Sequence, residues 1–279
     1  ILISASGSIG RLVEYLGKDE YFQDSNIVWL EHNGTINNQF LKHYYSIIKW
    51  NGLEGSTIKR LYNKSILSTS ITIPNLTEQK KIGAFFQNID SLIGLHQKKY
   101  DQLVVLKKAM LGKLFPKNGA TTPEIRFKGF TGDWVEKELK EIAPNISDGN
   151  WIESNHVFDK GEYRIIQTGN LGLGNFLDKS NHAKYFHQKD FDEVRGNEIF
   201  PGDILISRLA EPAGRTIILP LTGFRMVTAV DVTIIRPDEN NFDSTFLMTQ
   251  LNTANILKVV NENVSGTSHK RISRRNLEK

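Results

Sequence analysis

Apolar positions in the middle of the chain recur at steps that alternate between three and four residues. The positions of this seam are Ile82, Phe85, Ile89, Leu92, Tyr100, Leu103, Leu106 and Met110, continued by Leu114, with His96 in the one gap. The spacing predicts a helix from Thr77 to Phe115 that packs lengthwise against another helix. At 1.5 Å per residue this helix would be roughly 57 Å long. So regular an apolar seam predicts a partner, either a further helix or a second copy of the chain.

Shorter elements are predicted on both sides of the long helix. Before it, the pattern indicates strands at 1–4 and 26–31, a helix at 39–50 and a strand-rich stretch at 65–74. After it, the pattern indicates a short helix within 123–143, strands at 163–166, 203–207, 216–220 and 230–237, and a helix from 244 to about 260. The predicted fold class is therefore α/β (α+β), with mixed strands and helices in two regions that the long helix separates.

The two flanks of the long helix repeat each other in sequence. The matching segments, in the same order and at an offset of about 203 to 211 residues, are 1–4 with 204–207, 10–11 with 214–215, 26–45 with 231–251, and 55–61 with 266–272. Repeats of this kind indicate copies of one structural unit. We therefore predict the back part of one module at 1–76, a spacer helix at 77–116, and the front and middle of a second module at 117–279. In this interpretation the first module lacks its lead-in, and the second lacks the helix that would follow it.

Composition narrows the class of protein only slightly. The 279 residues include no cysteine, which excludes disulfides and thiolate metal sites and fits a reducing cytoplasm better than secretion. No apolar run approaches the length of a membrane span, and the chain begins at Ile1 without a signal-peptide pattern. A net charge of +4 and a pI of about 9.0 favour a polyanionic partner only mildly.

Two stretches carry a resemblance to a known family. They are PNLTEQKKIGAFFQNID at 74–90 with the lysine-rich helix after it, and PEIRFKGFTGDWVEKELKEIA at 123–143. Together with ILIS…GR and G-T-S-x-K-R-I, this order resembles the specificity subunit of type I restriction–modification enzymes over essentially the whole chain. The resemblance implies two target-recognition domains that each read one half of a bipartite DNA sequence, held apart by a coiled coil. It further implies a cytoplasmic, nucleoid-associated protein.

The resemblance also implies what the chain does not do itself. Methyltransferase (modification) subunits and a restriction/translocase subunit would dock on it and carry the chemistry. S-adenosylmethionine, ATP and Mg²⁺ are therefore expected only on those partners. The chain itself is expected to be a non-catalytic DNA-binding subunit, with no catalytic residue, cofactor or metal of its own.

Candidate DNA contacts fall in two kinds of loop. Lys59 and Arg60 recur as Lys270 and Arg271, and a site shared by both copies suits phosphate contact better than base reading. The bases should be read by loops that differ between the copies, since Asn and Gln can bond adenine and Arg can bond guanine. The full set of candidates is Lys59, Arg60, Asn150, Trp151, Gln167, Thr168, Asn170, Arg208, Arg215, His269, Lys270, Arg271 and Arg274. Each residue taken alone also fits an ordinary surface loop.

Two other functional classes compete with DNA recognition. A DNA-modifying enzyme is disfavoured, because the glycines at 169, 172 and 174 fit a hairpin turn better than a cofactor loop, and the Glu78-Gln79-Lys80 triplet has no acidic partner placed to share a metal. A coiled-coil scaffold that binds only protein would explain the apolar seam equally well. Turnover with S-adenosylmethionine or Mg²⁺ would indicate the enzyme, and unchanged DNA mobility in the presence of a methyltransferase partner would indicate the scaffold.

Overall fold

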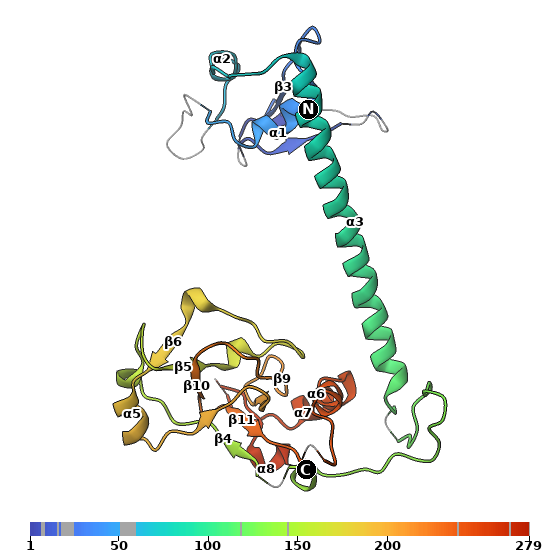
Figure 1. The fold of residues 1–279 in the computed structure, drawn as a ribbon, viewed down its shortest axis with the longest axis vertical. Helices are drawn as coiled ribbons and strands as arrows, with labels where there is room; N and C mark the ends of the chain where they lie inside the picture. Colours follow the sequence, from blue (N-terminus) through green and yellow to red (C-terminus); the bar gives the residue numbers. More distant parts are fainter. Residues whose placement is uncertain are drawn as a thin grey trace. The chain divides into compact units, whose positions relative to one another are not determined.

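The computed structural model describes residues 1–6, 9–15, 17, 25–50, 60–117, 119–143, 145–238, 240–267 and 269–278 (Figure 1). The chain divides into two compact units, Ile1–Val105 and Leu106–Lys279. This boundary falls inside the long helix, and the three-part division at 76 and 116 stays a prediction. Among the helices of the described ranges, none combines the length and the apolarity needed to cross a membrane.

The first unit is built on a small antiparallel sheet with the strand order β2-β1-β3. Its strands are β1 (Leu2–Ser4), β2 (Leu12–Val13) and β3 (Ile27–Trp29). They confirm the strands predicted at 1–4 and 26–31. Helix α1 (Asn38–Tyr45) packs on the sheet, where Ile3, Leu41 and Tyr45 form the buried core of the unit. The side chain of Asn37 caps this helix by accepting a hydrogen bond from Phe40 N at 3.0 Å.

The long helix is α3 (Leu76–Leu114), and its ends lie within one residue of the prediction. Asn75 caps its start, because its Oδ1 accepts a backbone hydrogen bond from the first turn at 3.0 Å. The first turns of α3 pack on the start of α1, where Asn37 N donates to Gln79 Oε1 at 2.9 Å. A Cβ atom on Gly83 would lie only 2.8 Å from Phe40 N. Glycine at this position therefore sets how closely the two helices approach.

The strand-rich stretch predicted at 65–74 is wrong. It contains the end of α2 (Asn63–Leu67) and then no regular element before α3. The hydroxyls of Ser68 and Thr69 both donate to the carbonyl of Ser65, at 3.3 and 2.6 Å. Such local bonds close a turn and offer the backbone an alternative to a sheet.

The second unit contains two four-stranded sheets. The first has the order β4-β11-β8-β9 and is antiparallel, with β4 (Ser147–Asp148), β11 (Val232–Ile235), β8 (Ile204–Ser207) and β9 (Thr216–Ile218). The second has the order β6-β5-β10-β7, with β6 (Lys184–Phe186), β5 (Tyr163–Ile166), β10 (Arg225–Thr228) and β7 (Glu198–Ile199). Among the strands that the structure describes, β5 and β10 form the one parallel pair. The strands predicted at 163–166, 203–207, 216–220 and 230–237 are confirmed.

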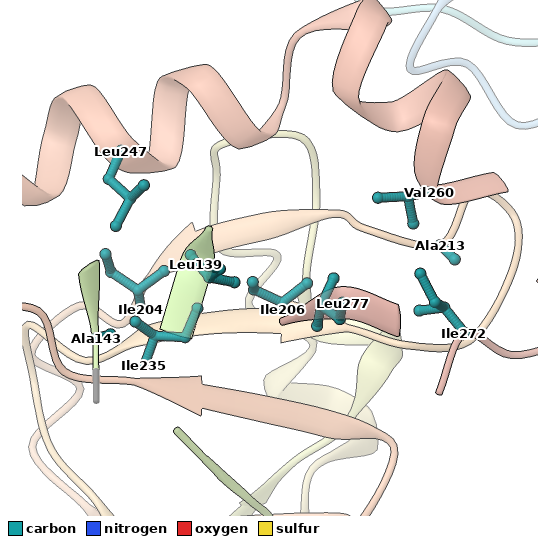
Figure 2. Close-up of a cluster of buried hydrophobic side chains, with 10 residues drawn as sticks. All are labelled: Leu139, Ala143, Ile204, Ile206, Ala213, Ile235, Leu247, Val260, Ile272 and Leu277. Carbon is teal, nitrogen blue, oxygen red and sulfur yellow. The ribbon is translucent and has the colours of Figure 1, made fainter. Parts of the chain in front are cut away.

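Helices cover one face of the β8–β11 sheet. They include α4 (Leu139–Ile142), α6 (Ser244–Leu251), α7 (Ala254–Glu262) and α8 (Arg274–Leu277). Figure 2 shows Leu247 of α6 and Val260 of α7 extending toward the sheet, where they belong to the same buried cluster as Ile204, Ile206 and Ile235. The other face of these strands contributes to a second buried cluster, so both faces of β8 and β11 are covered. This explains why their sequences are almost continuously apolar.

Two predicted helices are shorter in the structure. The helix predicted at 39–50 is α1, which ends at Tyr45, where the hydroxyl of the next residue donates back to the carbonyl of His43 at 2.6 Å. The helix predicted from 244 to 260 is broken into α6 and α7. The break occurs because Asn252 bonds β9 with its side chain, donating to Thr216 O at 2.7 Å and accepting from Thr216 N at 3.1 Å.

The sheets of the two units share one architecture, which confirms the repeat in the sequence. The central strand β1 pairs antiparallel with β2 and β3, as β8 does with β9 and β11. Each turn after the central strand is closed by the same backbone bond: Ser4 N donates to Arg11 O, and Ser207 N donates to Arg215 O, both at 2.9 Å. The matched segments therefore form the same strands and turns in both units.

Candidate nucleic-acid interface

Two of the predicted loops lie side by side in the second unit. The chain after β8 and the chain at 265–272 are joined by Ala210 N donating to Lys270 O and by Ile272 N donating to Arg208 O, both at 3.0 Å. Leu209 and Arg271 form an isolated β-bridge between them. Ile272 is buried and fixes the base of the second loop in the core. The fold therefore brings together candidates that are more than 50 residues apart in sequence.

The first unit repeats this junction. Ser6 and Arg60 form the corresponding bridge, and Leu61 N donates to Ala5 O at 2.8 Å. Leu61 is buried, as Ile272 is in the second unit. Arg60 is exposed at this junction, while Lys59 lies outside the described residues. Both units thus place an arginine, Arg60 or Arg271, at the same backbone junction.

Carboxylates hold several of the predicted arginines in the second unit. Asp148 Oδ2 lies 3.5 Å from both Arg208 Nη2 and Arg274 Nη1. Asp231 Oδ1 lies 3.0 Å from Arg271 Nη1. Arg208 is only 8% exposed and also donates to the carbonyl of Val230. These arginines are therefore tied into the fold, and Arg208 is the most completely held.

Arg215 links three segments of the same region. Its guanidinium donates to Glu211 O at 2.6 Å, to Thr168 O at 3.3 Å and to Ser207 Oγ at 3.4 Å. Burial lowers the pKa of Arg215 from its ordinary value. Because that value lies far above neutrality, the side chain stays charged. Arg215 thus holds the turn that contains Thr168 against the end of β8.

Of the residues predicted to read bases, some are exposed and others already form hydrogen bonds within the protein. Asn170 is 6% exposed, accepts from Gln167 N and donates to Leu177 O, both at 2.9 Å. Asn150 accepts from Asn197 N at 2.7 Å. Gln167 is exposed, and Trp151 is 69% exposed. Gln167 and Trp151 are therefore the members of this set best placed to meet a ligand.

The remaining cationic candidates are at the surface. His269 and Lys270 are exposed, and so is Arg275 nearby, which is not among the residues predicted from the sequence. Within the described residues none of the three forms an ion pair with a carboxylate. Arg274 is exposed as well, but it lies 3.1 Å from Glu278 in addition to its contact with Asp148. Uncompensated positive charge thus concentrates at the tip of the 265–275 segment. Such charge is what a phosphate backbone attracts.

The apolar seam of α3 is largely open to solvent. Its members Phe85, Leu92, Tyr100, Leu103 and Leu106 are each more than half exposed, while Ile82, Ile89 and Met110 are intermediate. In the described part of the first unit, α1 and its cap contact α3 through Gln79, Phe86 and Asp90, which are not members of this seam. The exposed apolar surface is what the sequence pattern predicts for a helix whose partner lies outside the unit.

Some residues of the interface are not predicted by sequence patterns. Asp148 and Asp231 position the arginines, yet Asp148 ends the short strand β4 and Asp231 lies in the turn before β11, and neither belongs to a distinctive motif. Their only sequence signal is a carboxylate directly next to a strand, which many turns share. The contacts between segments far apart in the chain reveal their role.

Comparison with known proteins connects this architecture to a family. A family model for the type I restriction modification DNA specificity domain matches residues 1–104 and 131–279. A Haemophilus influenzae protein that carries the name of a type I restriction enzyme specificity subunit is 48% identical over 93 residues, which are 33% of this chain and 24% of that protein. The MjaVIII specificity subunit of Methanocaldococcus jannaschii is 29% identical over 168 residues, covering 57% of this chain and 39% of the relative.

The same family appears among solved structures. The crystal structure of a type I restriction–modification S subunit from M. genitalium aligns with all of this chain and with 69% of that chain, at a TM-score of 0.51 and 17% identity. At 17% identity, this comparison shows that the two chains share a fold and nothing beyond it. The match to the two sequence relatives covers well under half of their length.

Proposed function

Since the chain belongs to the type I restriction–modification DNA specificity family, we propose that it recognises the DNA sequence on which a restriction–modification complex acts. Each of its two modules reads one half of a bipartite site, and the chain itself carries out no catalytic step. The fold supports this proposal because two similar units are connected through one continuous helix. Two weak readers joined by a stiff connection gain affinity only for half-sites at the matching separation.

The main observation behind the proposal is that both units have the same backbone arrangement at the end of the central strand but carry different side chains there. The bridge of Ser6 to Arg60 in the first unit and that of Leu209 to Arg271 in the second each place an arginine beside the end of the central strand. The neighbouring position is Ala5 in one copy and Arg208 in the other. Such a frame can present a common phosphate contact together with a different reading surface, which is what two unlike half-sites require.

The roles of the individual candidates follow from their environments. Lys270 and Arg275 contact phosphates, because their charges are exposed and unpaired within the described residues, and the exposed imidazole of His269 donates a hydrogen bond beside them. Trp151 and Gln167 meet the bases or sugars at the exposed edge of the loops. Arg208, Arg215, Arg271 and Arg274 chiefly orient these loops through their own hydrogen bonds and ion pairs.

The exposed apolar seam of α3 is a surface on which a protein partner binds. An apolar helix face of this kind buries itself against a second helix, supplied by another part of the specificity subunit or by a second copy of the chain. Methyltransferase subunits and a restriction/translocase subunit dock on the assembled complex. S-adenosylmethionine, ATP and Mg²⁺ bind to those subunits, and this chain needs no cofactor.

Methylation sequencing of host DNA tests the proposal directly. Cells with the gene should carry a bipartite methylated motif, and the motif should vanish when the gene is deleted and return when it is restored. A double variant, Lys270→Ala with Arg275→Ala, should reduce methylation at the same motif without creating a new one. Unchanged methylation in the deletion strain would contradict the proposal.

A scaffold function is the second candidate, because the exposed seam would serve protein association alone equally well. The two functions differ in a gel-shift experiment with DNA of mixed sequence and the methyltransferase partner. DNA recognition requires that adding this chain to the methyltransferase slows the DNA. A scaffold would bind the methyltransferase and leave the DNA mobility unchanged. Turnover by the isolated chain with S-adenosylmethionine or Mg²⁺ would instead indicate an enzyme.

A further inference from the structure

Three potential metal ligands lie together in the second unit. His156 ends the 3₁₀ turn η1 (Ser154–His156), and Asp190 and Glu193 are three residues apart on α5 (Gln188–Glu193). One side-chain nitrogen or oxygen atom from each of the three lies within 4.8 Å of the others. Residues three apart on a helix share one face, so a single turn of α5 presents both carboxylates to the histidine.

The hydrogen bonding of this group is incomplete. His156 Nδ1 lies 2.8 Å from Asp190 Oδ1. Asp190 is only 5% exposed, and its second oxygen, Oδ2, is buried without a hydrogen-bond partner. A buried carboxylate oxygen that bonds nothing is costly, and native proteins usually satisfy it with a donor, a water or an ion. Glu193 is exposed and completes the cluster from the solvent side.

We propose that His156, Asp190 and Glu193 bind a divalent transition metal, with Zn²⁺ the best match. Zinc accepts imidazole nitrogen and carboxylate oxygen together, at roughly 2.0–2.2 Å, and is satisfied by four ligands. Three come from the protein, and the exposed position of Glu193 leaves the fourth to water. Calcium takes six to eight oxygen ligands and Mg²⁺ prefers oxygen in an octahedron, so a site with an imidazole and only two carboxylates suits them poorly.

The metal would connect the η1 turn to α5. The imidazole of His156 is already oriented by the buried ring of Phe186, 6.1 Å away between centroids. The η1 turn begins three residues after Trp151, which the proposed DNA-reading surface includes. Binding would thus stabilise the second unit and fix the segment that follows Trp151. The site itself rests on the cluster geometry and is independent of the DNA-recognition proposal.

The test uses the full chain without a histidine tag, titrated with Zn²⁺ in a calorimeter, with metal content measured in parallel. We expect one Zn²⁺ per chain. Glu193→Gln removes an exposed ligand with little effect on packing and should weaken Kd by about tenfold or more, by analogy with losses around metal sites. His156→Gln should abolish binding. Glu136→Gln, the same change at an exposed glutamate elsewhere in the unit, is the matched control and should bind normally.

Thermal unfolding gives a second readout. Zn²⁺ at roughly one hundred times its Kd should raise the Tm of the wild-type second unit by about 5–10 °C, and it should leave the Tm of His156→Gln unchanged. Absence of Zn²⁺ binding to the wild-type chain would overturn the proposal and assign the cluster to a simple His–Asp ion pair. Equal binding by the wild type, Glu193→Gln and His156→Gln would overturn it as well, because the metal would then bind elsewhere.

Discussion

Arg208 shows how a positively charged residue can serve the fold instead of the surface. Its guanidinium bonds Val230 O and lies near Asp148, and its backbone joins two loops. Arg208→Ala leaves a buried carbonyl and part of a carboxylate without a donor, so we expect a loss of about 2–4 kcal/mol in the free energy of unfolding of the second unit. Urea denaturation followed by circular dichroism measures this. Arg275→Ala is the control and should change it by less than about 0.5 kcal/mol.

Lys270 and Arg275 should behave in the opposite way. Both are exposed, so Lys270→Ala and Arg275→Ala should preserve stability and lower the affinity for DNA about equally for all sequences. Each substitution should reduce the slope of log K against log salt by about 1. Fluorescence anisotropy of the assembled complex at several salt concentrations measures both effects. Lys258→Ala, on the surface of α7, is the control, and a salt slope that is the same in all four proteins would contradict the phosphate role.

The contact between α1 and α3 depends on a missing side chain. A Cβ at Gly83 would lie 2.8 Å from Phe40 N and 2.9 Å from Asn37 Oδ1, whereas one at Gly94 would meet nothing within 4 Å. Gly83→Ala should therefore destabilise the first unit despite the better helix propensity of alanine. Gly94→Ala should stabilise α3 by up to about 1 kcal/mol. Hydrogen exchange of the α1 amides distinguishes them, and equal protection in the two variants would show that the close approach is unimportant.

The seam of α3 makes a prediction about association. Leu92 and Leu103 are exposed in the described chain, so Leu92→Glu with Leu103→Glu should leave both units folded. The double variant should weaken binding to the partner helix or to a second copy, because each charge would have to be buried in an apolar interface. Sedimentation velocity with and without the methyltransferase subunit measures this. Lys98→Glu with Lys107→Glu, off the seam, is the control.

At the level of elements, sequence patterns predicted what local periodicity determines. The long helix and the buried strands β1, β8 and β11 were visible because their apolar spacing is regular over the whole element. The interruptions within predicted elements were not visible in the sequence. Asn252 interrupts the helix at 244–260 only because Thr216 lies beside it, and that contact comes from a segment 36 residues away.

At the scale of the whole molecule, the length of α3 should set the spacing of the DNA site. Duplicating residues 91–97 adds one heptad, which keeps the apolar seam in phase and lengthens the helix by roughly 10 Å. The non-specific gap between the half-sites should then grow, by at most about three base pairs at roughly 3.4 Å each. Methylation sequencing measures the gap. As a control, residues 91–97 are replaced by seven other helix-forming residues that keep the apolar seam, and the gap should then stay unchanged. An unaltered gap in the longer protein would contradict the role of α3.

The candidate site was predictable in its location and less so in its chemistry. The repeat singled out the segments at 204–207, 214–215 and 266–272, and the structure places the chain between the first two in direct contact with Lys270 and Ile272 of the third. Which of their arginines are free was not predictable, because Asp148 and Asp231 reach them from other parts of the chain. The His156 cluster had no sequence signal, since His156 lies 34 residues before Asp190 and shares no motif with it.

The backbone bonds that close the two junctions have a consequence for how such genes can change. Ala5 with Leu61, and Arg208 with Ile272, are joined by the same main-chain hydrogen bond, which no side chain takes part in. The side chains around each junction can therefore vary without breaking the bond that closes it, so substitutions there can change the bases that a module reads while its fold stays the same.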